Sequence, residues 1–391
     1  MFQKIDPTAT ARIAILSLLA TLVIALSGCA GLRTKADSER DRLVTGGYQG
    51  NETLAVLLPE SGRFAGAANV VRAGILAARE ADPEGKRPKL RFYDSAAGSI
   101  SALVRQAAKD GARLAIGPLQ KPAVEKLAGS TTLPIPVLAL NRVAAAAKPS
   151  NLYQFSLAPE DEVSEIAARA WGEGHRKAVI LYPKSKWGER MSRAFRRQWK
   201  AQGGTLVTAQ AFNPRATDFS STVKKLSEQV AQADFMFLAT PSKLARRAWV
   251  QIRSKLGTKT RVYATSHIYD GHFDPKDDKY LVGLNFVEIP WLVEPTPGDA
   301  VSSKGLSKQL PRLYAMGIDA YRLGSRLDWL SGNPQVRVQG KTGTLRLDSR
   351  RRVQRKLTLA RMDATGPVKL EPTSDQQKPE LRIFAWAKSL F

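Results

Sequence analysis

From residue 54 onward, short apolar runs alternate with longer segments whose apolar residues recur at helical spacing. Short runs of this kind predict strands that are buried on both faces, and the longer segments predict the helices that connect them. The strands predicted in this half are 54–59, 90–93, 114–116 and 136–140. Helices are predicted to begin near Gly66, Ser99 and Pro122. Parallel strands need such crossover helices, so the pattern predicts a parallel sheet.

The same alternation is repeated between residues 161 and 265. Its predicted strands are 178–182, 206–211, 235–239 and 262–265, and its predicted helices are 161–171, 187–202, 218–229 and 242–255. Two successive sets of strands and helices predict an α/β protein with two doubly wound parallel-sheet lobes.

The predicted helix 187–202 has two contrasting faces. Trp187, Met191, Phe195 and Trp199 follow one another at intervals of four, and the opposite side carries Arg190, Arg193 and Arg197. We expect the aromatic stripe to pack on the second sheet, as amphipathic helices do. The three arginines are candidate contacts for a partner.

The last third of the chain predicts an extended return segment at 280–291 and a long helix at 307–330. After these, residues 343–348 and 353–363 predict a hairpin that turns at 349–352.

The N-terminus has the three-part layout of a secretory signal. Lys4 and Arg12 precede an apolar run at 13–26, and small residues precede Cys29. The run is shorter than the roughly twenty residues that a membrane-spanning helix needs. We therefore predict a signal peptide at 1–28, a lipidated Cys29 that anchors the chain in a membrane, and a polar tether that ends at residue 51.

Composition limits the chemistry that the chain can carry. A single Cys excludes a disulfide framework, and three His residues are too few for the usual zinc clusters, so we expect no metal and no cofactor. The formal charge of +25 favours anionic partners. Export removes nucleic acid from that set, which leaves anionic lipid, lipopolysaccharide, cell-wall polymer or an acidic protein face.

Seven phrases, in their order and spacing, resemble the LppC/LpoA family of lipoprotein activators of penicillin-binding proteins. They are 54–64 (LAVLLPESGRF), 116–118 (IGP), 136–141 (PVLALN), 153–155 (YQF), 263–269 (YATSHIY), 290–291 (PW) and 313–321 (LYAMGIDAY). The resemblance covers nearly all of the chain from residue 54. It implies a fold like that of type I periplasmic binding proteins, with lobe 1 at about 52–155 and 286–335 and lobe 2 at about 156–285 and 336–391.

The resemblance also implies a location and a partner. Ala30, and not Asp, follows Cys29, which by resemblance to enterobacterial sorting implies the outer membrane, with the protein facing the periplasm. The implied function is activation of a bifunctional penicillin-binding protein, a peptidoglycan synthase. The chain departs from the better-known members in one respect: they carry a helical-repeat domain where this chain has the short tether.

Small and polar residues follow several predicted strands, where doubly wound sheets bind their ligands. These candidate ligand residues are Ser61, Gly62, Asn141, Ser266 and Tyr269. The same residue types also favour ordinary turns. A lipid-anchored solute receptor for an amino acid or peptide is therefore the alternative function.

Two short motifs match penicillin-binding enzymes, namely Ser221 to Lys224 and Lys341 to Gly343. They fall in different predicted contexts, and a chain this rich in Lys and Ser is expected to contain such spacings by chance. The carboxylates and the three His residues form no acid–base constellation. We therefore expect that the protein is not an enzyme and assign no catalytic residue.

Overall fold

The computed structural model describes residues 47–144, 146–257, 260–295 and 310–371. The predicted signal peptide and Cys29 lie outside these ranges. Residues from Tyr48 onward belong to one compact unit, and the folded structure below is that of this unit alone. Within the described ranges, no helix combines the length and the apolar character needed to cross a membrane.

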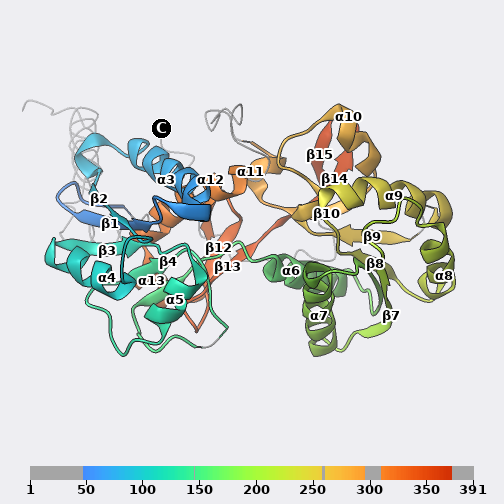
Figure 1. The fold of residues 1–391 in the computed structure, drawn as a ribbon, viewed down its shortest axis with the longest axis horizontal. Helices are drawn as coiled ribbons and strands as arrows, with labels where there is room; N and C mark the ends of the chain where they lie inside the picture. Colours follow the sequence, from blue (N-terminus) through green and yellow to red (C-terminus); the bar gives the residue numbers. More distant parts are fainter. Residues whose placement is uncertain (1–46, 145, 258–259, 296–309, 372–391) are drawn as a thin grey trace, which may run out of the picture. The chain divides into compact units, whose positions relative to one another are not determined.

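The first sheet contains five parallel strands. They are β1 (Thr53–Leu58), β2 (Lys89–Asp94), β3 (Ala112–Ile116), β4 (Val137–Ala139) and β5 (Leu152–Gln154), in the order β2-β1-β3-β4-β5 (Figure 1). The connecting helices are α3 (Ala65–Glu80), α4 (Ile100–Lys109) and α5 (Lys121–Ala128). The four predicted strands and three predicted helices of this half are confirmed. β5 was not predicted as a strand.

The second sheet contains seven strands. Its parallel part is formed by β6 (Lys177–Pro183), β7 (Thr205–Phe212), β8 (Phe235–Leu238), β9 (Arg261–Ala264) and β10 (Asn285–Glu288), in the order β7-β6-β8-β9-β10. The helices are α6 (Pro159–Gly172), α7 (Lys186–Ala201), α8 (Ser220–Ala231) and α9 (Ser242–Leu256). If the parallel strands of each half are numbered from one, both sheets have the order 2-1-3-4-5. The predicted fold of two doubly wound sheets is therefore confirmed.

The C-terminal third differs from its prediction in three places. Residues 280–291 are not one extended segment. The end of the 3-10 helix η4 (Lys279–Leu281) is followed by a turn at Gly283, which has a positive φ, then by the short strand β10 and by helix α11 (Pro290–Val293), where Pro290 begins a helical turn. β10 pairs with β9 and with β14 (Thr358–Asp363), so the predicted lobe boundary between 285 and 286 passes through a strand of the second sheet.

The predicted long helix is interrupted. α12 (Leu310–Gly324) ends and α13 (Leu327–Gly332) begins three residues later. A Cβ atom at Gly324 would lie 2.3 Å from the Tyr48 hydroxyl, so the chain turns where it is tightly packed against another segment.

The predicted hairpin forms, but its second strand is divided at Leu357. β13 (Val353–Lys356) pairs with β12 (Thr344–Leu347), whereas β14 joins the second sheet together with β15 (Gly366–Lys369). A short strand, β11 (Val338–Gln339), completes a three-stranded sheet with β12 and β13. Leu357 is therefore where the chain passes from this small sheet into the second sheet.

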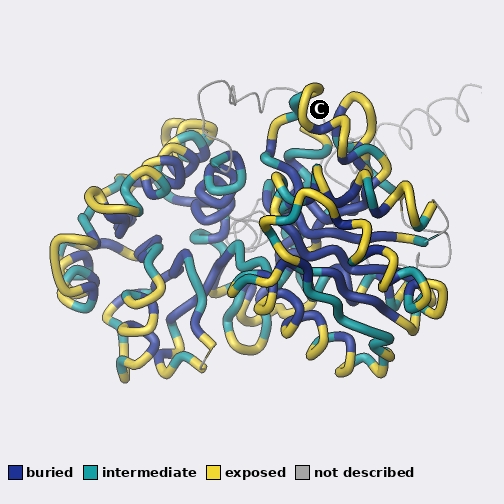
Figure 2. Tube along the Cα trace, turned by 45° about the vertical axis from the view of Figure 1, so that its right-hand side comes forward, coloured by how far each residue is buried: buried dark blue, intermediate teal, exposed yellow. Residues whose placement is uncertain are grey.

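Alternate residues of each central strand enter different hydrophobic cores, as expected for strands covered on both faces. In the first sheet, Val56 packs with α3 and α12, whereas Leu57 packs with α4 and α5. In the second sheet, Ile180 packs with α6 and α7, and Leu181 packs with α8 and α9. Figure 2 shows the resulting buried strands inside partly exposed helices.

The predicted aromatic stripe of α7 is part of this core. Met191, Phe195 and Trp199 are fully or almost fully buried. The Phe195 ring stacks on Phe237 of β8 at a centroid distance of 4.8 Å. The expectation that this stripe packs on the second sheet is confirmed.

Helices α3 and α12 meet through two glycines. A Cβ atom at Gly317 would lie 2.2 Å from the Val71 carbonyl oxygen, and one at Gly74 would lie 2.1 Å from that of Tyr314. We expect Gly317→Ala to lower the free energy of unfolding by about 1–3 kcal/mol, since the helices must separate. Chemical denaturation measures the change.

The control for this prediction is Gly66→Ala in the partner helix α3, where the added Cβ atom meets nothing within 4 Å. Its stability should stay the same or rise by up to about 1 kcal/mol, because alanine favours helix. Equal stability of the Gly317→Ala and Gly66→Ala chains would contradict the close packing of α3 on α12.

Candidate functional site

Two of the three predicted ligand residues of the first half lie at the topological switch point of the first sheet, between β1 and β3. Ser61 and Gly62 follow β1, and both are exposed. Gly62 has a φ of +72°, a conformation that favours glycine. This is the position at which doubly wound sheets bind ligands. None of the predicted ligand residues carries a charge.

Asn141 follows β4, and its side chain is occupied locally. Its Nδ2 donates to the Leu119 carbonyl oxygen at 3.0 Å, and its Oδ1 accepts from the backbone N–H of Arg142 at 2.9 Å. The side chain is half-buried. Asn141 therefore fixes the loop after β4, and each end of its amide already has a protein partner.

Ser266 and Tyr269 follow β9 and are buried. Ser266, in the short 3-10 helix η3 (Ser266–Ile268), donates its backbone N–H and its hydroxyl to the Glu162 carboxylate, at 2.8 and 2.9 Å. Burial alone would raise the pKa of Glu162, but nearby His267, Arg355 and Arg312 hold it below its usual value. The charged carboxylate of α6 thus holds the loop after β9.

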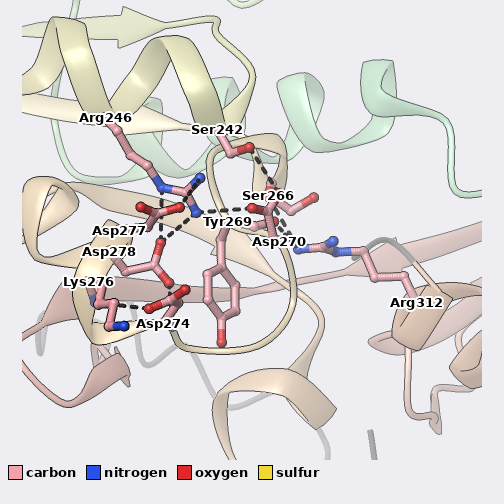
Figure 3. A network of polar contacts seen from close by, with 10 residues as sticks. All are labelled: Ser242, Arg246, Ser266, Tyr269, Asp270, Asp274, Lys276, Asp277, Asp278 and Arg312. Carbon is pink, nitrogen blue, oxygen red and sulfur yellow. Dashed lines mark hydrogen bonds and ion pairs between the residues drawn. The ribbon is translucent and has the colours of Figure 1, made fainter. Parts of the chain in front are cut away.

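Arg312 of α12 connects to this same loop. It donates to the backbone oxygens of Ser266 and Tyr269, at 3.2 and 3.1 Å, and forms an ion pair with Glu288 of β10. The Glu288 carboxylate is completely buried, and desolvation raises its pKa despite the neighbouring guanidinium. Since α12 packs on α3 beside the first sheet, Arg312 links the two halves of the fold. Figure 3 shows Arg312 reaching toward Ser266 and Tyr269.

A second network, centred on Arg246 of α9, holds the far end of the loop. Arg246 pairs with Asp278 at 2.8 Å and with Asp270 at 3.0 Å, and Ser242 donates to Asp270 (Figure 3). Asp274 caps α10 (Pro275–Asp278). The sequence analysis did not find this network, although four aspartates between residues 270 and 278 were a visible signal.

The predicted partner-contact arginines all lie on the exposed side of α7. Arg190 pairs with Glu160 of α6 at 3.0 Å, and Arg193 lies 3.7 Å from Glu189, one turn earlier in α7. Exposed pairs of this kind contribute little to stability. The structure therefore leaves the arginine side of α7 accessible.

A family model described as "LppC putative lipoprotein" matches residues 43–364, which include every described helix and nearly every described strand.

The chain belongs to the LppC family.

Curated relatives with which this LppC protein shares sequence are named penicillin-binding protein activator LpoA. The one from Yersinia pseudotuberculosis is 29% identical over 313 residues, and the one from Klebsiella pneumoniae is 30% identical over 302 residues. Each alignment covers 69% of this chain but only 48% and 43% of the relative. The LppC protein thus spans less than half the length of these relatives.

Solved structures give the same fold. The C-domain of LpoA (YraM) from Haemophilus influenzae, described as a regulator of PBP1A, is 23% identical, with a TM-score of 0.70 over 82% of this chain and 100% of that chain. A structure from Chromobacterium violaceum, described as a "putative branched-chain amino acid ABC transporter", is 32% identical, with a TM-score of 0.67 over 80% of this chain and 100% of that chain.

The two enzyme-like motifs have structural positions in this LppC protein. The backbone N–H groups of Lys341 and Thr342, and the Thr342 hydroxyl, donate to the buried Asp319 carboxylate of α12 at 2.6–2.8 Å. Ser221 and Lys224 lie on the exposed surface of α8, which packs on α9 and β7. The first motif is therefore a turn held by α12, and the second is part of a surface helix.

A small pocket lies near the end of β1. It has a volume of about 10 Å³ and is lined by residues that include Glu60, Arg72 and Phe92. A volume of this size accommodates about one water molecule, which is less than an amino acid requires. Among the described residues, no group of three or more His, Cys, Asp or Glu side chains is arranged to hold a metal ion.

Proposed function

We propose that this LppC protein is an outer-membrane lipoprotein, anchored through Cys29, that activates peptidoglycan synthesis by binding a bifunctional penicillin-binding protein. One observation carries the proposal: the family match extends from residue 43 to 364 and so includes both sheets. The relatives that align with it over about three hundred residues carry the activator name. The activator acts by contact, without catalysis of its own.

The contacts around Ser266 and Tyr269 favour a regulator over a solute receptor. A receptor needs polar groups that are free to bind its ligand. Here the polar groups of Ser266 and the backbone oxygen of Tyr269 are bonded to Glu162 and Arg312. To activate a synthase by contact, the protein must bind the active conformation more tightly than the inactive one, because equal binding would shift no population.

The test is a cross-linking assay with purified bifunctional penicillin-binding proteins of the same organism. Cross-linked glycan is measured with and without the soluble chain from Ala30 onward, which contains the whole compact unit. We expect stimulation of one synthase and not of its paralogue. Folded chain that stimulates none of them would contradict the proposal.

The solute receptor remains the second candidate because of the Chromobacterium violaceum structure, which is 32% identical over its whole length. A ligand that binds only the folded chain raises its unfolding temperature, and the rise grows with the logarithm of the ligand concentration once that concentration exceeds Kd. A thermal-shift screen of amino acids and short peptides therefore separates the two functions. A reproducible rise with one ligand, together with no effect on any synthase, would replace the activator with the receptor.

A further inference from the structure

The solvent side of α7 is a cationic stripe. From Lys186 to Lys200, every exposed residue of the helix is charged. Six of these residues are basic and one is acidic: Lys186, Glu189, Arg190, Arg193, Arg196, Arg197 and Lys200. At 1.5 Å per residue the stripe is roughly 21 Å long, with at least one cation on each turn. The opposite side of the helix is locked into the core by Phe195 and Trp199, so the stripe has a fixed orientation.

The contacts that these charges make in the described structure contribute little to fold stability. Arg190 and Arg193 pair with acids, and Arg196 donates to the Ser192 hydroxyl at 3.4 Å, its one hydrogen bond among the described residues. Placing six cations on one helix face raises their mutual repulsion, which an anionic surface would relieve. The stripe is therefore better explained by something it binds than by the packing of α7.

The chemistry of the stripe identifies the kind of partner. Protein interfaces obtain most of their affinity from a few buried aromatic or apolar anchors. The exposed large hydrophobic residues of the described chain are Leu76, Val250, Tyr280 and Val368, and none of them lies on α7. Arginine, which forms four of the six cations, matches the oxygen geometry of phosphate groups. A flat row of cations without anchors suits a surface of phosphates better than a protein.

The chain also keeps such a surface within reach. Family membership and the lone Cys29 indicate a lipid anchor, and eighteen residues lie between Cys29 and Tyr48, where the compact unit begins. A chain of that length extends at most roughly 65 Å. A bilayer surface is therefore always within a distance that the compact unit can cover, unlike a soluble partner that must be met by diffusion.

We propose that the α7 stripe binds the phosphate headgroups of an anionic lipid surface and so holds the compact unit against the membrane that anchors it. The stripe attracts the headgroups electrostatically and inserts no apolar side chain between them. This function is separate from synthase activation and does not depend on it.

The experiment compares two variants of the soluble chain from Ala30 onward. The stripe variant carries Arg193→Gln, Arg197→Gln and Lys200→Gln. The control variant carries Lys224→Gln, Lys225→Gln and Lys243→Gln, which are exposed on α8 and α9 at the other face of the same sheet. Both variants lose three positive charges, so net charge is matched. Equal unfolding temperatures would verify that both keep the fold.

Binding is measured by co-sedimentation with vesicles of phosphatidylglycerol and phosphatidylcholine, and with vesicles of phosphatidylcholine alone. We expect the unmodified chain to bind only the anionic vesicles, and raised salt to release it. The stripe variant should bind at least about tenfold more weakly, and the control variant nearly as well as the unmodified chain. Equal losses in both variants would assign binding to net charge and overturn the proposal. Absence of binding to the anionic vesicles would also overturn the proposal. This outcome would include the case in which the stripe binds an acidic protein instead of lipid.

Discussion

Replacement of Arg312 with methionine is expected to lower the free energy of unfolding by about 3–5 kcal/mol, the loss typical of a buried ion pair that has lost one partner. Arg312 is the cationic partner of Glu288, whose side chain has no exposed area. It also satisfies the backbone oxygens of Ser266 and Tyr269. The variant therefore leaves one buried carboxylate and two carbonyl groups without this donor. Urea denaturation of the soluble chain measures the change.

The pH dependence of this loss identifies its cause. Desolvation already raises the pKa of Glu288 in the folded chain, and removal of Arg312 eliminates the main influence that lowers it. A carboxyl group whose pKa is higher in the folded than in the unfolded state stabilises the folded chain at low pH. This stabilisation is lost as the pH rises from the unfolded-state pKa through the folded-state pKa. The deficit of the Arg312→Met chain should therefore be smaller below the ordinary Glu pKa of 4.5 than at neutral pH.

The double variant Arg312→Met with Glu288→Leu provides the control. Replacing both members of a buried pair with apolar residues is often close to neutral, so this chain should recover most of the stability lost by Arg312→Met alone. A deficit that persists in the double variant and does not change with pH would show that the two backbone carbonyls, and not Glu288, are responsible.

The sequence predicts the repeating part of the fold well, for a physical reason. Parallel strands such as β1, β6 and β8 are buried on both faces, so they consist of apolar runs. Such runs can be recognised in the sequence without knowledge of the tertiary structure. The three-residue strand β5 is too short to give such a signal. The interruption between α12 and α13 was likewise invisible, because it depends on the contact of Gly324 with Tyr48, which is remote in sequence.

The candidate site shows the same limit more clearly. Ser61, Ser266 and Tyr269 follow strands, as the sequence pattern predicts, but that pattern did not reveal what they contact, and their role in ligand binding stays a prediction. The partner of Ser266 is Glu162, which lies 104 residues away in the chain. A polar residue at a strand end of a doubly wound sheet is therefore a weak indicator of a ligand site, because a charged residue from a distant part of the chain can form the same hydrogen bonds with it as a ligand would.

The second large effect is expected for replacement of Cys29. This residue lies outside the described ranges, so the prediction rests on the sequence alone. Cys29→Ser should eliminate lipid labelling of the chain and release it from the membrane fraction at high salt, since the acylated thiol is the predicted anchor and no other Cys is present. Metabolic labelling with a fatty acid, followed by fractionation, measures both. Ser27→Ala is the matched control, because it keeps a small residue before Cys29 and should leave labelling intact.

Salt separates this anchor from the proposed α7 stripe. Lipid chains hold a protein by apolar transfer, which salt does not weaken, whereas the attraction of Arg193 or Arg197 to headgroups is screened. We therefore expect the Cys29→Ser chain to remain partly with anionic membranes at low salt and to leave them at high salt. The unmodified chain should stay bound at both. A Cys29→Ser chain that resists a high-salt wash would show that the apolar run at 13–26 itself anchors the protein, and would exclude lipidation as its sole attachment.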